Sequence, residues 1–174
     1  MVNLQQNKKV LIIFGLLTSI MFIIVMFIVN PLIDGKTGLE VIKLQLAFKT
    51  NLGKSIIEKW NETGQNNFLK YIYTDFIYAF SYSIFLSSIY LHKLLKNNIQ
   101  ISTKHIMILS IPIIAGIFDM IENTIEIIFI KSPNNFSELL FFLHSILSLL
   151  KWLTFPIILY FLLKRNYAQQ NINS

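Results

Sequence analysis

The stretch VLIIFGLLTSIMFIIVMFIV, residues 10–29, decides the fold because its twenty consecutive residues include no charged side chain. An α-helix rises about 1.5 Å per residue, so a run of this length matches the bilayer hydrocarbon core, which is about 30 Å thick. Lys8 and Lys9 precede the run, and Asn30-Pro31 ends it. The run is too long for the apolar core of a signal peptide, and no small-residue cleavage pattern follows it. We therefore expect a retained membrane span.

Three further apolar runs of similar length follow and predict spans at about 71–91, 106–130 and 139–163. Hydrophobic residues make up 54% of the chain and charged residues only 14%, which is more apolar side chain than a soluble fold of 174 residues buries. The sequence predicts an all-α fold, a four-helix transmembrane bundle that forms a single membrane domain over residues 1–174. We expect the polar tail, 166–174, to be disordered.

Residues 31–68 are the one substantial polar stretch, and they predict an outer loop between the first and second spans. Apolar positions recur there among lysines and acids, which is typical of a segment that rests on lipid headgroups. The pattern from Thr50 to Asn61 indicates an amphipathic interfacial helix. Thr50 is its predicted N-cap, and Gly64 is expected just past its end.

The net charge of +6 comes mostly from lysines at the ends of apolar runs. Such flanking charge favours the lipid bilayer as partner and argues against nucleic acid. The two membrane sides would each hold seven basic residues, but six of those on the outer side are spread through the long 31–70 segment, where the positive-inside rule is less reliable. We therefore predict that both termini are cytoplasmic. The abundance of Ile, Lys and Asn is typical of AT-rich bacterial genomes and suggests a bacterial cytoplasmic membrane.

Three of the predicted spans carry polar side chains at helical spacing. At about 100° per residue, the polar residues of each span fall on one stripe. A charge at the bilayer centre costs about 2.5–3.5 kcal/mol on insertion scales, so the stripes should face one another inside the bundle. The candidate ligand- or ion-binding residues on these stripes are Asp75 and Tyr78 in the second span, Asp119, Glu122, Asn123 and Glu126 in the third, and His144, Ser148 and Lys151 in the fourth.

The depth of each residue along its helix predicts how the stripes pair. Helical side chains lean toward the N-terminus, which brings the Lys151 ammonium level with Asp119 and predicts an ion pair. Four acids then face one lysine and one histidine, so protons, a bound cation or water must neutralise the surplus charge. We also expect His144 to lie near Glu122 or Asn123, and Asp75 to lie near the level of Glu126. The hydroxyl groups of four residues could donate hydrogen bonds to the carboxylates, namely Tyr71, Tyr78, Tyr82 and Ser148.

Several features between residues 44 and 152 occur together. They are the amphipathic segment ending near Trp60 and Gly64, the entry to the second span from Tyr71 to Asp75 with Tyr78 following, Asp119-x-x-Glu122-Asn123, and Ser148-x-x-Lys151-Trp152. In these features the chain resembles a group of uncharacterised bacterial four-span integral membrane proteins. The resemblance implies a four-span fold and a characteristic set of positions. It brings no activity with it.

The leading functional hypothesis is a membrane protein that binds or transports a small ligand, a cation or a proton through Asp75, Asp119 and Glu122. Two alternatives remain open. One is a lipid-modifying integral membrane enzyme that uses a carboxylate and His144 as acid and base, and the other is a non-catalytic structural or immunity-type partner whose polar stripes hold the bundle together. Catalytic residues and cofactors stay unassigned. We expect no metal site, because the chain has no cysteine and no Glu-x-x-His or His-x-x-x-His spacing.

Overall fold

The computed structural model describes residues 3–29, 33 and 39–164, and within them the fold is all α with no strand. The predicted tail and residues 30–32 and 34–38 of the predicted outer loop lie outside the described residues. The elements are α1 (Leu4–Ile23), the π-helix η1 (Ile24–Val29), α3 (Leu39–Gln45), α4 (Thr50–Ile57), α5 (Glu62–Lys96), α6 (Thr103–Lys131), the 3₁₀ turn η2 (Pro133–Asn135) and α7 (Glu138–Leu163).

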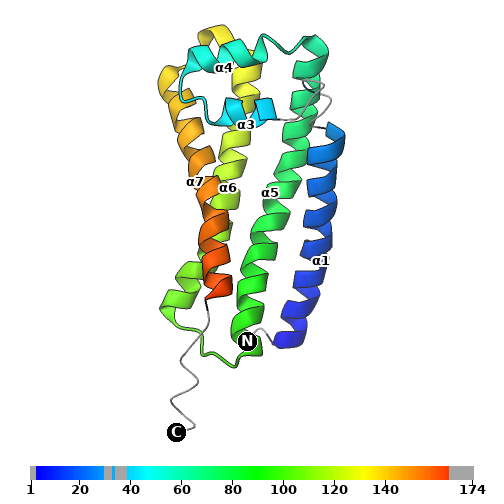
Figure 1. The fold of residues 1–174 in the computed structure, drawn as a ribbon, viewed down its shortest axis with the longest axis vertical. Coiled ribbons are helices and arrows are strands. Elements are labelled where there is room, and N and C mark those ends of the chain that lie inside the picture. The colour runs from blue at the N-terminus through cyan, green and yellow to red at the C-terminus, as the bar shows by residue number, and fades with distance from the viewer. Residues whose placement is uncertain (1–2, 30–32, 34–38, 165–174) are drawn as a thin grey trace.

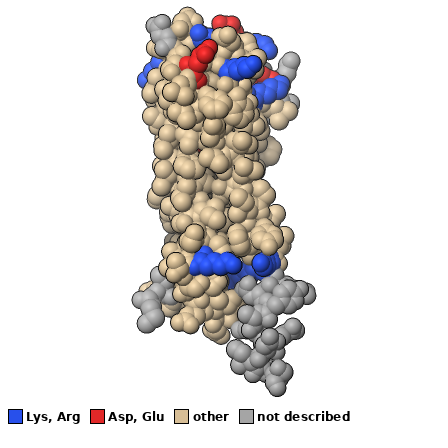
Figure 2. Space-filling view, turned by 90° about the vertical axis from the view of Figure 1, so that its left-hand side faces the viewer, with Lys and Arg blue, Asp and Glu red and all other residues tan. Residues whose placement is uncertain are grey.

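Three helical segments are long and apolar enough to cross a membrane, namely Leu4–Phe27, Thr103–Lys131 and Glu138–Leu163. Large apolar side chains cover their outward faces, where Ile13 is 61% and Met107 is 65% exposed. Figure 2 shows the charged side chains of one face gathered at the two ends of the molecule, with an uncharged band between them. An apolar belt between two charged ends is the surface that a bilayer requires, so this is a membrane protein.

Helix α5 lies between α1 and α6, and α6 packs in turn against α7 (Figure 1). Helix α5 contains the predicted span 71–91 but begins earlier, at Glu62. The Asn61 side chain caps its start by accepting a hydrogen bond from the Gly64 N–H at 2.8 Å. Gly64 therefore lies in the first turn of α5, beyond the end of the amphipathic helix but not directly after it as predicted. A Cβ on Gly64 would lie 2.5 Å from the carbonyl oxygen of Ile33, so this close backbone approach requires glycine.

Helices α3 and α4 lie across one end of the bundle (Figure 1). The predicted amphipathic helix exists but ends at Ile57, and its N-cap is Lys49 rather than Thr50. Helix α3 was not predicted. The turn between the two helices depends on a tertiary contact, because Phe48 has a φ of 55° and its N–H donates to Ser145 Oγ at 3.1 Å. Local sequence carries no signal for such a contact.

The opposite end of the bundle is held by Lys93, near the end of α5. Its ammonium donates hydrogen bonds to the carbonyls of Phe161 at 2.8 Å, Leu162 at 2.9 Å and Lys164 at 2.7 Å. These carbonyls belong to the last turn of α7 and the residue after it, which have no partner in their own helix. A cation there satisfies them and complements the helix dipole. Lys93 thus fixes the end of α7 against α5.

Helices α5 and α6 are in close contact at Gly116. A Cβ at this position would lie 2.8 Å from the Ser83 Cβ and 3.1 Å from the Ala79 carbonyl oxygen. Real Cβ contacts are longer, so a larger residue would push the helices apart. The glycine lets the polar stripe of α5 meet that of α6.

Candidate functional site

The polar stripes of α5, α6 and α7 face the interior of the bundle, as their helical spacing predicts. Each of their charged or amide side chains is at least 95% buried. The buried groups are Asp75, Asp119, Glu122, Asn123, Glu126, His144, Ser148 and Lys151. Because none of these groups faces lipid, any compensation for their burial must come from one another or from a ligand.

Lys151 is the cation of this cluster. Its Nζ lies 2.8 Å from Asp119 Oδ1 and 2.8 Å from Glu122 Oε2. The predicted contact with Asp119 is present, and Glu122 adds a second carboxylate that the depth argument did not assign to Lys151. One buried ammonium therefore serves two acids on adjacent turns of α6.

The other two acids have weaker partners. Asp75 Oδ2 accepts a hydrogen bond from Asn123 Nδ2 at 3.1 Å, which ties α5 to α6. His144 lies near Glu122, as predicted, with ligand atoms of the two side chains within 4.8 Å, but its hydrogen bond joins Nε2 to Glu126 Oε1 at 3.1 Å. The physical reason is that Lys151 draws Glu122 toward itself, which leaves Glu126 to meet the imidazole.

The expected hydroxyl donors do not all reach the carboxylates. Ser148 Oγ donates to the backbone carbonyl of His144 in its own helix at 3.0 Å, so its predicted role is wrong. The hydroxyl of Tyr82, in contrast, is buried beside Asp119.

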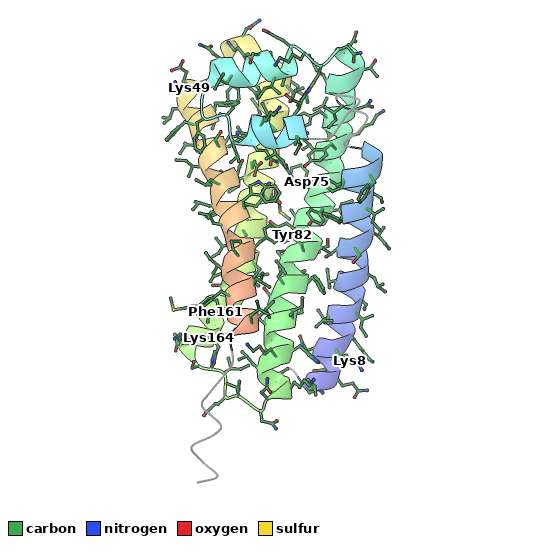
Figure 3. The ribbon with its side chains drawn as sticks, viewed as in Figure 1. Lys8, Lys49, Asp75, Tyr82, Phe161 and Lys164 are labelled. Atoms are coloured by element: carbon green, nitrogen blue, oxygen red, sulfur yellow. The ribbon has the colours of Figure 1, made fainter. Side chains whose placement is uncertain are left out.

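A cavity of about 520 Å³ opens beside the cluster. Of the candidate residues, Asp75, Tyr78, Asp119 and Lys151 line this cavity, together with Tyr82. Figure 3 shows Asp75 and Tyr82 on α5, below α3. The other candidates, Glu122, Asn123, Glu126, His144 and Ser148, are not part of the cavity wall. The structure therefore divides the predicted site into a cavity and a closed cluster next to it.

The rim of the cavity is apolar and was missed from the sequence. Phe22 comes from α1 and Trp152 from α7, and they are 43% and 42% exposed. Within the described residues α1 and α7 both contribute to the cavity wall without packing extensively together. Trp152 Nε1 also donates to Gln45 Oε1 of α3 at 3.4 Å. Apolar residues within membrane spans carry no signal that could have identified them as cavity wall.

Asp75 is the acid of the cavity that has no basic partner. Among the described residues its side chain accepts a hydrogen bond from the neutral amide of Asn123 and forms no ion pair, whereas Asp119 is paired with Lys151. The aromatic rings of Tyr71, Tyr78 and Tyr82 also line the cavity. The arrangement offers a carboxylate and aromatic rings to whatever occupies the space, which suits a positive charge.

No family model, curated protein or solved structure matches the chain.

Proposed function

We propose that this chain crosses the membrane four times and binds a small amphiphilic cation in the cavity between α1, α5 and α7. The fourth crossing is α5, which runs beside the three apolar helices from one end of the bundle to the other (Figure 1). Its tyrosines and serines make it less apolar than its neighbours. Since α1 and α6 flank it, it can cross with fewer lipid-facing apolar residues.

The arrangement of lysines supports cytoplasmic termini in a bacterial membrane. Helix α1 begins and α7 ends at the same end of the bundle, opposite α3 and α4 (Figure 1). Short segments rich in lysine normally stay on the cytoplasmic side. The lysines in the short segments at this end are Lys8, Lys9, Lys93, Lys96, Lys104 and Lys164. The cavity then lies in the outer half of the membrane.

The observation that carries the binding proposal is Asp75, a 97% buried carboxylate that faces a cavity and has no basic partner among the described residues. A buried carboxylate is costly unless a cation or several donors compensate it. Asn123 supplies only one donor. A ligand cation beside Asp75 would provide the missing compensation, and the three tyrosine rings would add cation–π attraction.

The rest of the cavity suits an apolar body attached to that charge. Phe22, Val25 and Phe155 contribute apolar side chains to its wall. A volume of about 520 Å³ is within the usual range for small-molecule pockets, about 300–1,000 Å³. Entry between α1 and α7, past the exposed rings of Phe22 and Trp152, would admit a ligand that has already partitioned into the membrane. Binding of this kind is also the first step of transport.

The two alternatives have less support. A lipid-modifying enzyme needs its acid or base at the substrate, but His144 does not line the cavity. A purely structural protein would have a filled interior in which each buried polar group has a partner. Here a cavity is present, and the buried Asn123 Oδ1 has no hydrogen-bond partner among the described residues. Both observations favour ligand binding.

Tetraphenylphosphonium, a membrane-permeant cation with an apolar body, is a suitable probe. We expect the full chain in lipid nanodiscs to bind it above the level of empty nanodiscs. Asp75→Asn keeps a group that can accept from Asn123 but removes the charge, and it should weaken binding about 10- to 100-fold, or about 1.4–2.8 kcal/mol. Glu62→Gln, an exposed acid on the same helix, is the matched control. Equal binding by wild type and Asp75→Asn would refute the proposal.

A further inference from the structure

Next to the cavity, two acids of α6 and one histidine of α7 converge. Glu122 and Glu126 lie one helical turn apart, and His144 faces them from the neighbouring helix. Each residue offers one ligand atom, and these three atoms lie within 4.8 Å of one another. Their exposed fractions are 0%, 1% and 1%. The sequence spacing did not indicate this group, because a ligand supplied by a second helix leaves no local motif.

The three side chains keep polar atoms that nothing in the described structure satisfies. Glu122 Oε1, Glu126 Oε2 and His144 Nδ1 are buried and have no hydrogen-bond partner. Leaving a buried charged acceptor unpaired is more costly than leaving a neutral one. The carboxylates are therefore poised for a partner that supplies positive charge to both.

The surroundings do not supply that charge. The titratable groups near the triad are Tyr71 and Asp75 of α5, Asp119 of α6 and Lys151 of α7. Lys151 is the one lysine among them, and it is already shared between Asp119 and Glu122. Without further cations or protons the cluster is strongly negative. A dication would neutralise the two glutamates.

We propose that Glu122, Glu126 and His144 form a binding site for a first-row divalent transition metal, of which Zn²⁺ is the simplest probe. An imidazole with two carboxylates is a ligand set that suits zinc, iron or manganese, whereas calcium and magnesium prefer oxygen alone. Leu44, Phe129 and Phe141 surround the Glu126 and His144 side of the site with apolar groups that exclude water. The metal would bridge α6 and α7 inside the bundle.

Metal binding would also change the neighbouring ion pair. Glu122 now contacts Lys151 at 2.8 Å, and a dication would compete with the ammonium for this carboxylate. Lys151 would keep Asp119 as its partner, also at 2.8 Å. Because Lys151 and Asp119 line the cavity, the metal would act on the wall of the proposed cation pocket without occupying it.

The test is zinc binding by the full, untagged chain in detergent. Wild type should retain about one zinc ion per chain after gel filtration, and Co²⁺ should give a visible absorption band stronger than that of the aqueous ion. Since loss of an outer-shell partner alone typically costs 10–100-fold, loss of a ligand in Glu126→Gln or His144→Gln should lower zinc affinity about 100-fold or more. Circular dichroism establishes whether each variant is folded. If Glu126→Gln does not fold, His144→Gln provides the test.

Matched controls separate this site from surface binding and from the cation pocket. Glu62→Gln and His105→Ala change the same residue types outside the triad and should leave zinc binding unchanged. Asp75→Asn removes a charge of the cation pocket but no ligand of the metal site, so this variant should also retain zinc. Failure of the pocket proposal and failure of the metal proposal can therefore be distinguished. Absence of zinc from the folded wild type at micromolar free Zn²⁺, or equal zinc binding by wild type and folded Glu126→Gln, would overturn the inference.

Discussion

Replacing Lys151 by methionine tests the electrostatic centre of the bundle. Lys151 is 95% buried, and its ammonium contacts Asp119 and Glu122, both at 2.8 Å. Methionine keeps most of the side-chain volume but leaves two buried carboxylates without their cation. Removing one partner of a buried ion pair typically costs about 3–5 kcal/mol. We expect Lys151→Met to lower the free energy of unfolding by this amount.

The double variant Lys151→Met with Asp119→Asn distinguishes a specific pair from general damage. Once the cation is gone, neutralising Asp119 removes one of the two uncompensated charges. The double variant should therefore lose no more stability than Lys151→Met alone, with a coupling energy of about 1–3 kcal/mol. The assay is reversible unfolding by sodium dodecyl sulfate in mixed micelles, followed by circular dichroism. Lys104→Met, an exposed lysine at the start of α6, is the control and should change stability by less than about 0.5 kcal/mol. Additive losses from the two substitutions would refute the reasoning.

Three further predictions concern the bundle and its orientation. Gly116→Leu should cost about 1–3 kcal/mol, because its side chain would collide with Ser83, and the same unfolding assay measures it. Lys93→Met should lower stability by about 1 kcal/mol through loss of its bonds to the end of α7, and hydrogen exchange there should rise; unchanged exchange would contradict this. Because the chain has no cysteine, Lys9→Cys and Lys54→Cys can be labelled singly in intact cells, where an impermeant thiol reagent should reach position 54 alone. Labelling at position 9 would reverse the proposed orientation.

The sequence alone was sufficient to predict which side chains turn inward. The spacing of Asp119, Glu122, Asn123 and Glu126 puts them on one stripe, and in the structure each is at least 98% buried. The physical reason is strong, because a charge facing lipid is costly and only one face of the helix is polar. Helix periodicity therefore determines the direction of these residues whatever the details of packing.

Pairing between helices was only partly predictable. Depth along the helix correctly predicted the pair between Lys151 and Asp119. It did not identify Glu126, rather than Glu122, as the acid that forms a hydrogen bond with His144. One turn of helix is about 5.4 Å, which a long side chain can span, so depth leaves neighbouring turns undecided. Which acid meets which base depends on how the carboxylates share the one ammonium.

The cavity had no sequence signal at its apolar rim. Phe22 and Val25 belong to a run whose composition is explained by lipid, so nothing distinguishes a cavity-lining residue there from a lipid-facing one. Helix α3 was missed for a related reason, since its seven residues are too few for a clear periodicity. Both features depend on the tertiary arrangement of elements distant in sequence.

The proposed cation site requires that its buried acids give the cavity a negative potential, and reaction rates at a single cysteine in the cavity measure that potential. Tyr78 lines the cavity, and the chain has no cysteine of its own, so Tyr78→Cys provides one reporter. A cationic methanethiosulfonate should react with it about tenfold or more faster than an anionic one, relative to their rates with a free thiol. Adding Asp75→Asn should remove most of this preference. Equal normalised rates for the two reagents at Tyr78→Cys, or a preference that Asp75→Asn leaves intact, would contradict the account.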